Sequence, residues 1–167
     1  GVPAPGSQAQ FVGFVIAQHF NTPLNVIAYR GGAPAIADLL GGQVASVIVP
    51  CDGLIEHRKA GRVRVLAMAS DKRYAAMPDV PTFAELGVAM PSDTFLAVYA
   101  AASLRPEVLR QVNEATRAMF DDPKVVERIS ATGMEPAYAN GDELARIVDR
   151  GVAFWGEQVR KSAFQAQ

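Results

Sequence analysis

The sequence predicts an α/β protein in which a parallel sheet carries helices on its faces. Between residues 24 and 70, short apolar runs rich in β-branched residues alternate with helical patterns in the order β-α-β-α-β. Glycines and prolines stand at the ends of these runs, where strands and helices stop. The chain has 167 residues, 50% of them hydrophobic, which is enough for one sizeable core or for two small lobes.

Each element is predicted from its own pattern. The expected strands are 24–29, 43–50, 62–70, 94–102 and 134–139. The expected helices are 7–19, 33–41, 51–61, 105–122, 122–133 and 140–163. Ser7, Asp122 and either Asn140 or Gly141 stand at helix starts, whereas Gly41 or Gly42, Gly61 and Gly133 stand at helix ends. Two blocks result: a compact α/β unit over residues 1–92, and a second block of two strands and three helices over 93–167.

Composition excludes several classes of protein. The net charge is −1 and no basic stripe is present, so nucleic acid is not an expected partner. No run approaches the roughly 18 apolar residues that span a bilayer. The single cysteine excludes an internal disulfide and fits either cytoplasm or periplasm. The chain begins without Met or a charged leader, so we expect a removed leader or a piece of a longer protein.

Catalytic and metal sites are weakly supported. Cys51 precedes an expected helix, whose N-terminus would lower a thiol pKa, and His57 follows six residues later. A lone Cys and His specify a site poorly, so an ordinary cysteine is the favoured interpretation. His19 ends a helix, where a cation is favourable, and the two histidines have no third metal ligand at usable spacing. We therefore predict no catalytic residue, no metal and no cofactor.

Anion binding by the backbone is the remaining chemistry. The stretches "PAPGSQAQ" and "YRGGAPA" both run into helices at residues 7 and 33. A helix N-terminus offers unpaired N–H groups and a positive dipole end to a carboxylate or phosphate. The pair Gly31 and Gly32 lets a ligand oxygen approach the backbone, although a simple tight turn explains the same glycines.

The order of four motifs resembles one receptor family. These are "PGSQAQFVGFVIAQ", "YRGGAPAIADLLGGQV", "HRKAGRVRVLAMASDKRYAAMPDVPTFAELG" and "FDDPKVVERISATGMEPAYANGDELARIVDRGVAFWGEQVRKS". Together they resemble the Bug-type substrate receptors of tripartite tricarboxylate transporters, over nearly the whole chain. The resemblance implies a two-lobed, periplasmic-binding-protein-like fold that closes on a small carboxylate without catalysis. It also implies export to the periplasm and membrane transporter subunits as partners.

The resemblance assigns the two blocks to lobes. Residues 1–92 correspond to the whole of the second lobe, and residues 93–167 to the C-terminal portion of the first lobe. The N-terminal part of the first lobe is absent from the chain. A truncated relative that forms homo-oligomers, or that binds nothing, is the alternative to a carboxylate receptor, and a cysteine enzyme using Cys51 and His57 is a third hypothesis.

The resemblance also implies a ligand site. The candidate ligand-binding residues are Ser7, Gln8, Ala9, Tyr29, Gly31, Gly32, Ala33 and Asp52. Gly31, Gly32 and Ala33 are expected to present bare N–H groups to the ligand carboxylate, with Arg30 at the rim. Val49-Pro50 stand where the family usually has Asp or Asn, so a polar contact is lost unless Asp52 replaces it. Gln10 stands where His is common, and the 94–102 stretch lacks the usual Trp, which indicates a preference for a less polar acid.

Overall fold

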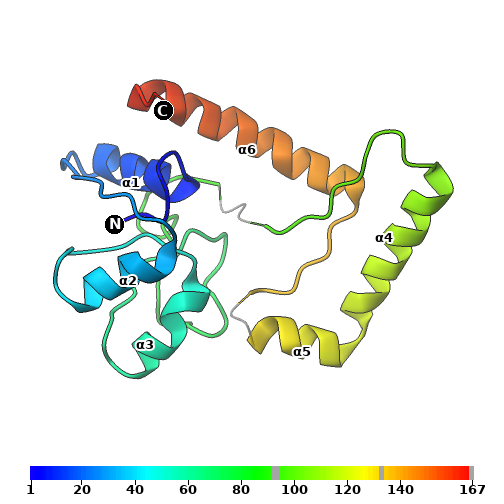
Figure 1. Cartoon of the computed structure of the whole chain (residues 1–167), viewed down its shortest axis with the longest axis horizontal. Helices are drawn as coiled ribbons and strands as arrows, with labels where there is room; N and C mark the ends of the chain where they lie inside the picture. Colours follow the sequence, from blue (N-terminus) through cyan, green and yellow to red (C-terminus); the bar gives the residue numbers. More distant parts are fainter. Residues whose placement is uncertain (92–94, 132–133, 166–167) are drawn as a thin grey trace. The chain divides into compact units, whose positions relative to one another are not determined.

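A computed structural model of the chain describes residues 1–91, 95–131 and 134–165 (Figure 1). Its helices are α1 (Gln8–His19), α2 (Gly32–Leu40), the 3-10 helix η1 (Cys51–Leu54), α3 (Ile55–Lys59), α4 (Pro106–Asp121), α5 (Pro123–Ala131) and α6 (Gly141–Ser162). Every predicted helical stretch is confirmed. The stretch 51–61 divides into two short pieces, η1 and α3. No helix in the described part of the chain is both long and apolar enough to span a bilayer.

Polar side chains stabilise the starts of α5 and α6 as predicted. The Asp122 carboxylate accepts a 2.9 Å hydrogen bond from the Lys124 N–H. Asn140 rather than Gly141 caps α6, because Asn140 and Glu143 each accept a hydrogen bond from the other's backbone N–H at 3.0 and 2.9 Å. This reciprocal pair is a capping box.

Glycines end the helices where a left-handed backbone is needed. After α2, Gly42 has φ +70° whereas Gly41 has φ −83°, so Gly42 is the glycine that the turn requires. Gly61 has φ +67° two residues beyond α3. Gly133, predicted to end α5, lies outside the described residues.

The predicted parallel sheet is not confirmed. Within residues 1–91, 95–131 and 134–165 no residue is assigned to a β-strand, and the predicted strand residues there are all non-helical. Parallel pairing occurs instead as two isolated bridges, Val2 with Ala28 and Met68 with Thr82. A strand needs successive bridges, and each of these two bridges stands by itself. The start of the predicted 94–102 strand lies outside the described residues.

Three extended segments nevertheless run side by side and parallel. Val2 donates to Ile27 O and accepts from Tyr29 N–H, both at 2.9 Å. On its other side, Gly1 donates to Ser46 O at 2.7 Å and accepts from Ile48 N–H at 2.9 Å. The order across this small array is therefore 27–31, 1–3, 46–48, with residues 1–3 in the middle.

The chain divides into two compact units. The first comprises Gly1–Ser92 and Gly151–Gln167, and the second comprises Asp93–Arg150. The division agrees with the predicted boundary near residue 92, but residues 151–167 belong with the first unit because the last part of α6 packs there. The assignment of residues 1–92 and 93–167 to two receptor lobes stays a prediction.

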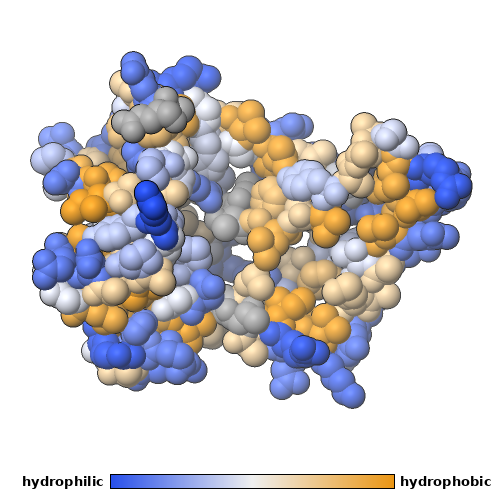
Figure 2. All heavy atoms as spheres, viewed as in Figure 1, coloured by the Kyte–Doolittle hydropathy of each residue, from blue (hydrophilic) through white to orange (hydrophobic). Residues whose placement is uncertain are grey.

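The core lies in the first unit. Its buried apolar side chains are Val2, Phe11, Val12, Val15, Ala35, Ile36, Met77, Val80 and Val88. In the second unit, no described residue between 95 and 150 is buried. Apolar side chains are therefore visible on its surface, as Figure 2 shows over α4 and α5.

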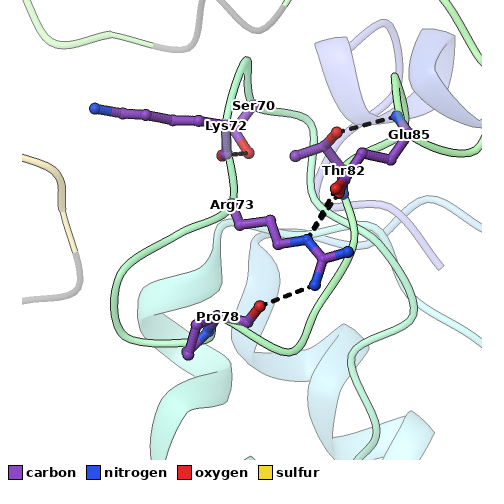
Figure 3. A network of polar contacts seen from close by, with 6 residues as sticks. All are labelled: Ser70, Lys72, Arg73, Pro78, Thr82 and Glu85. Carbon is purple, nitrogen blue, oxygen red and sulfur yellow. Dashed lines mark hydrogen bonds and ion pairs between the residues drawn. The ribbon is translucent and has the colours of Figure 1, made fainter.

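The proline-rich connector after residue 70 contributes to the core. Its side chains Met77, Val80 and Val88 are buried. Arg73 donates from Nε to both Glu85 oxygens at 2.9 and 3.0 Å, and from Nη1 to Pro78 O at 3.1 Å (Figure 3). Glu85 also accepts from Thr82 N–H at 2.7 Å, while its own N–H donates to the Thr82 hydroxyl. These bonds hold the connector in the shape that buries its apolar side chains.

Candidate functional site

The starts of α1, α2 and η1 lie at one edge of the three-segment array. Residues 1–3 lead into α1, residues 27–31 lead into α2, and residues 46–48 lead into η1. Because the three segments are parallel and adjacent, the elements that follow them begin at the same edge. All eight candidate residues belong to these three junctions or to the segments entering them, and that they form one ligand site stays a prediction.

One of the three backbone amides at the start of α2 is already hydrogen-bonded within the protein. Gly31 N–H donates to Pro3 O at 2.8 Å, so the prediction that Gly31 presents a bare N–H is wrong. The bond forms because residue 31 is the last of its segment to pair with the 1–3 segment. Gly32 and Ala33 have no acceptor for their N–H groups among the described residues. Pro34 has no N–H, so these two amides are what α2 offers a ligand.

The two glycines at this junction have different roles. Gly31 has φ +108° and ψ +171°, a conformation that is essentially confined to glycine, yet an added Cβ would meet nothing within 4 Å. Gly32 is helical, and a Cβ there would lie 3.8 Å from a Val49 methyl, which is an ordinary contact. Gly31 is therefore required by the backbone, whereas Gly32 leaves space beside its amide.

The start of α1 provides a hydroxyl and a further amide. Ser7 is the N-cap residue, but its hydroxyl donates to Ala4 O at 2.7 Å instead of bonding the helix N–H groups. Because its one hydrogen is already donated to Ala4 O, the Ser7 hydroxyl can only accept further hydrogen bonds. It would have to rotate away from Ala4 before it could donate to a ligand carboxylate. Ala9 N–H has no acceptor within the described part of the chain. Gln8 lies between them at the first helical position.

Tyr29 supports the site from one side. Its hydroxyl donates to Asp38 of α2 at 2.8 Å. This hydrogen bond, with burial and the Asp38 charge, raises the pKa of the Tyr29 phenol. The ring also lies close to Gly1, where an added Cβ would be 2.8 Å from Cε2. Tyr29 thus ties α2 to the extended segments, and sequence reasoning gave no signal for its partner Asp38.

The third junction is apolar next to α2 and acidic beyond it. Val49 supplies the atoms nearest to a Cβ placed on Gly32, at a position where the resemblance implies only the loss of a polar group. Asp52 lies exposed in the first turn of η1. Burial, followed by the Asp52 charge, raises the pKa of the Cys51 thiol, which opposes the activated thiolate that a cysteine enzyme needs.

Other potential sites do not coincide with these junctions. The described ranges contain no group of three or more His, Cys, Asp or Glu side chains placed to hold a metal ion. A cavity of about 160 Å³ lies between α1 and the C-terminal segment, lined mainly by apolar side chains that include Phe11, Phe14 and Phe164. None of the eight candidate residues lines it.

Comparison with known proteins identifies the family. A profile described as "Tripartite tricarboxylate transporter family receptor" matches residues 1–164. The chain belongs to this family. Among curated proteins, it is similar to BugT of Bordetella pertussis, with 33% identity over 163 residues that cover 95% of this chain and 49% of BugT. The chain thus spans about half the length of the curated relatives it matches.

Solved structures show the fold of this chain. R. palustris Rpa4515, solved with adipate, has a TM-score of 0.77 and 22% identity over 95% of this chain and 53% of its own. The periplasmic binding protein BugD has a TM-score of 0.71 and 26% identity over 99% of this chain and 57% of its own. The fold is therefore periplasmic-binding-protein-like, and the family and these neighbours are solute-binding receptors, not enzymes.

Proposed function

We propose that this chain is the ligand-binding part of an extracytoplasmic receptor that delivers a small carboxylate to a tripartite tricarboxylate-type transporter. Family membership supports a receptor of this kind. The adipate in the structure of Rpa4515 supports a carboxylate as the ligand class. The observation in this chain that carries the proposal is the start of α2, where the Gly32 and Ala33 amides face no protein acceptor and lie beside Gly31.

Backbone amides recognise the carboxylate in this proposal. Gly32 and Ala33 N–H groups donate to one carboxylate, aided by the positive end of the α2 dipole. Ala9 N–H contributes from α1, the Ser7 hydroxyl does so after rotating away from Ala4 O, and Gln8 and Tyr29 border the same edge. Val49 replaces a polar group with methyls next to Gly32, so the part of the ligand nearest the carboxylate is apolar.

The location and partners of the receptor follow the same proposal. BugD, which has a similar fold, is a periplasmic binding protein. We infer that this receptor works in the periplasm, where it presents its ligand to the membrane subunits of the transporter. The two lobes predicted from the sequence, residues 1–92 and part of the first lobe in 93–167, would close on the ligand.

A thermal-shift and calorimetry panel tests the ligand class. The panel contains adipate, succinate, citrate, nicotinate and benzoate. A ligand that binds the native state alone at 100 times its Kd stabilises it by about 2.7 kcal/mol, so one acid should raise Tm in a dose-dependent way. No response to any acid would contradict carboxylate binding by this chain.

The variant Gly32→Asp tests the site itself. Like charges brought together cost several kcal/mol, so a carboxylate beside the Ala33 amide should weaken binding by about 100-fold or more. An acidic residue in the first helical turn is favourable, so the free energy of unfolding should not fall. Gly141→Asp places the same charge on the first residue of α6, where nothing lies within 4 Å, and should leave affinity unchanged. Unchanged affinity in Gly32→Asp would remove α2 from the site.

A homo-oligomeric protein is the second candidate function. The observation that favours it is the apolar stretch 95–99, in which Leu96 is 85%, Val98 79% and Tyr99 73% exposed. Exposed apolar runs of this kind promote association with another chain. Oligomeric state decides between this candidate and a monomeric receptor.

A further inference from the structure

The loop before α1, residues 4–7, has a defined shape. Ser7 N–H donates to Ala4 O at 3.3 Å, and Gly6 N–H donates to the Gln10 side-chain oxygen at 2.8 Å. Gly6 itself has φ +68°, which turns the chain toward α1. These bonds hold the loop together and tie it to α1, but neither of them reaches an element beyond α1.

Phe164 supplies a contact from the far end of the sequence. Its ring meets the Phe11 ring edge to face, with 5.6 Å between centroids. An added Cβ on Gly6 would lie 3.1 Å from Phe164 Cζ and 3.2 Å from Cε1, so the ring is packed directly against this glycine. Figure 1 shows the end of α6 beside α1, in agreement with these contacts. The ring therefore bridges the loop and the first turn of α1.

The backbone turns directly after α6, and this turn places the Phe164 ring against Gly6. Ala163 has φ +52°, a conformation rarely adopted by a residue with a side chain. Phe164 N–H then donates to the Ser162 hydroxyl at 3.3 Å, and that hydroxyl donates to Val159 O at 2.8 Å. A strained residue persists where its surroundings fix it, so the turn at Ala163 and the packing of Phe164 support each other.

The space behind the ring is not filled. The cavity of about 160 Å³ is bordered by Phe164, Phe11, Phe14, Leu24 and Val26, with the Gln10 side chain at the loop side. Removing the Phe164 ring would merge its volume with this cavity. Gly6 would then lose the ring, which supplies the atoms nearest to a Cβ placed there, Cζ at 3.1 Å and Cε1 at 3.2 Å.

We propose that Phe164 is a positioning residue for the carboxylate site: it holds Gly6, and through it Ser7 and the first amides of α1, in the orientation that binds ligand. The inference rests on the proposed function and deepens it. It makes the C-terminal segment part of the site, although the segment lies more than 150 residues from the loop and carries no ligand-binding group.

Two separate measurements test the proposal on the whole chain. Hydrogen exchange without ligand reports on the Gly6, Ser7, Gln10 and Phe11 amides, all of which are hydrogen-bonded. Calorimetry with adipate reports on affinity. In Phe164→Ala we expect exchange of these four amides to increase at least tenfold relative to the α2 amides, and affinity for adipate to fall at least tenfold. Phe164→Leu refills most of the space and should restore both.

A matched control separates positioning from general destabilisation. Phe154→Ala removes a ring of the same kind from α6, where Phe154 contacts Trp155 with 5.0 Å between centroids. This variant should leave exchange in the loop at the wild-type level. Equal exchange in Phe164→Ala and Phe154→Ala at the four amides would overturn the proposal. If the loop loosens only in Phe164→Ala while wild type binds no acid of the panel, the hold of Phe164 on the loop stands and the proposed function fails.

Discussion

Gly31 and Gly32 are adjacent in the sequence, but only Gly31 is required by its backbone conformation. Gly31 adopts a backbone conformation that other residues avoid, and its N–H is already bonded to Pro3. Gly32 has an ordinary helical backbone, its N–H has no acceptor among the described residues, and a Cβ there would make only an ordinary contact with Val49. The sequence pattern treated the pair as one motif, and only the dihedral angles distinguish them.

Gly31→Ala should destabilise the chain by about 1–3 kcal/mol, since an alanine at φ +108° and ψ +171° is strained whatever the available space. The free energy of unfolding in urea measures this cost. Gly141→Ala is the control, because Gly141 has no positive φ and no neighbour within 4 Å of an added Cβ. Its stability should be unchanged or slightly higher. Equal stability of the two variants would contradict the conformational requirement.

Cys51 should react slowly with thiol reagents at neutral pH. Its folded-state pKa is raised, first by burial and then by Asp52, so less thiolate is present in the folded chain than in the unfolded chain. Labelling with a disulfide reagent should therefore be slower in the native protein than in urea. Asp52→Asn removes one cause and should increase the native rate. Native labelling faster than in urea would revive the cysteine-enzyme hypothesis.

The connector between residues 70 and 88 shows how an element without regular structure is held in place. Thr82 is 2% exposed and exchanges hydrogen bonds with Glu85, and Arg73 binds the same carboxylate from outside (Figure 3). The spacing Thr-x-x-Glu is the same as in a capping box. The Glu85 carboxylate accepts hydrogen bonds from both Arg73 and Thr82. Neutralising this carboxylate would weaken both bonds and loosen the connector around its buried apolar side chains.

Replacing Glu85 should change how stability depends on pH. The Thr82 N–H, followed by Arg73, lowers the pKa of the Glu85 carboxyl in the folded state. The ionised Glu85 side chain therefore contributes to the free energy of unfolding above the ordinary pKa of a glutamate. This contribution is lost as the pH falls through the lowered pKa of the folded state. Glu85→Gln should therefore be less stable than wild type near neutral pH, and the difference should shrink in acid. Urea unfolding at a series of pH values measures it.

Arg73→Gln is the matched variant for this test. Because the Thr82 N–H is the larger cause of the shift, part of the pH dependence should remain when the arginine side chain is replaced. A difference between Glu85→Gln and wild type that stays constant down to acidic pH would contradict the role of the ionised carboxylate.

At the scale of the whole molecule, the two units differ in how much they bury. The first unit contains the core, whereas the described residues of 95–150 contribute no buried side chain. One face of α4 leaves Leu109, Val112 and Met119 substantially exposed. Helices gain most of their stability from packing an apolar face. The helices of the second unit bury less apolar surface than those of the first, so their stability depends more on contacts beyond their own unit.

Association of the chain should depend on the apolar stretch 95–99. If the homo-oligomeric candidate holds, sedimentation velocity will show association that increases with concentration, and Leu96→Lys will reduce it because Leu96 is 85% exposed. Gln111→Lys adds the same charge at an exposed position of α4 and should have no effect. A monomer at high concentration in wild type would exclude this candidate.

Much of the local structure and the family were predictable from the sequence. Helix bounds follow from periodicity and from capping residues within a few positions, such as Asn140 with Glu143 and Asp122 with Lys124. The four family motifs, read in order, predicted the receptor family that the profile match shows. The prediction of a parallel sheet was not confirmed. A β-branched composition indicates an extended backbone, but it does not indicate which other segment that backbone will pair with.

The sequence by itself determined where helices start and which junctions carry glycine, since these choices depend on propensities of adjacent residues. Only the tertiary structure decided that the Gly31 amide is committed to Pro3, that Tyr29 bonds Asp38, and that Phe164 packs on Gly6. Each of these contacts joins residues that no local rule connects. They form because burying apolar surface and pairing backbone groups bring distant segments together, and the amides that remain unpaired are fixed only when that packing is complete.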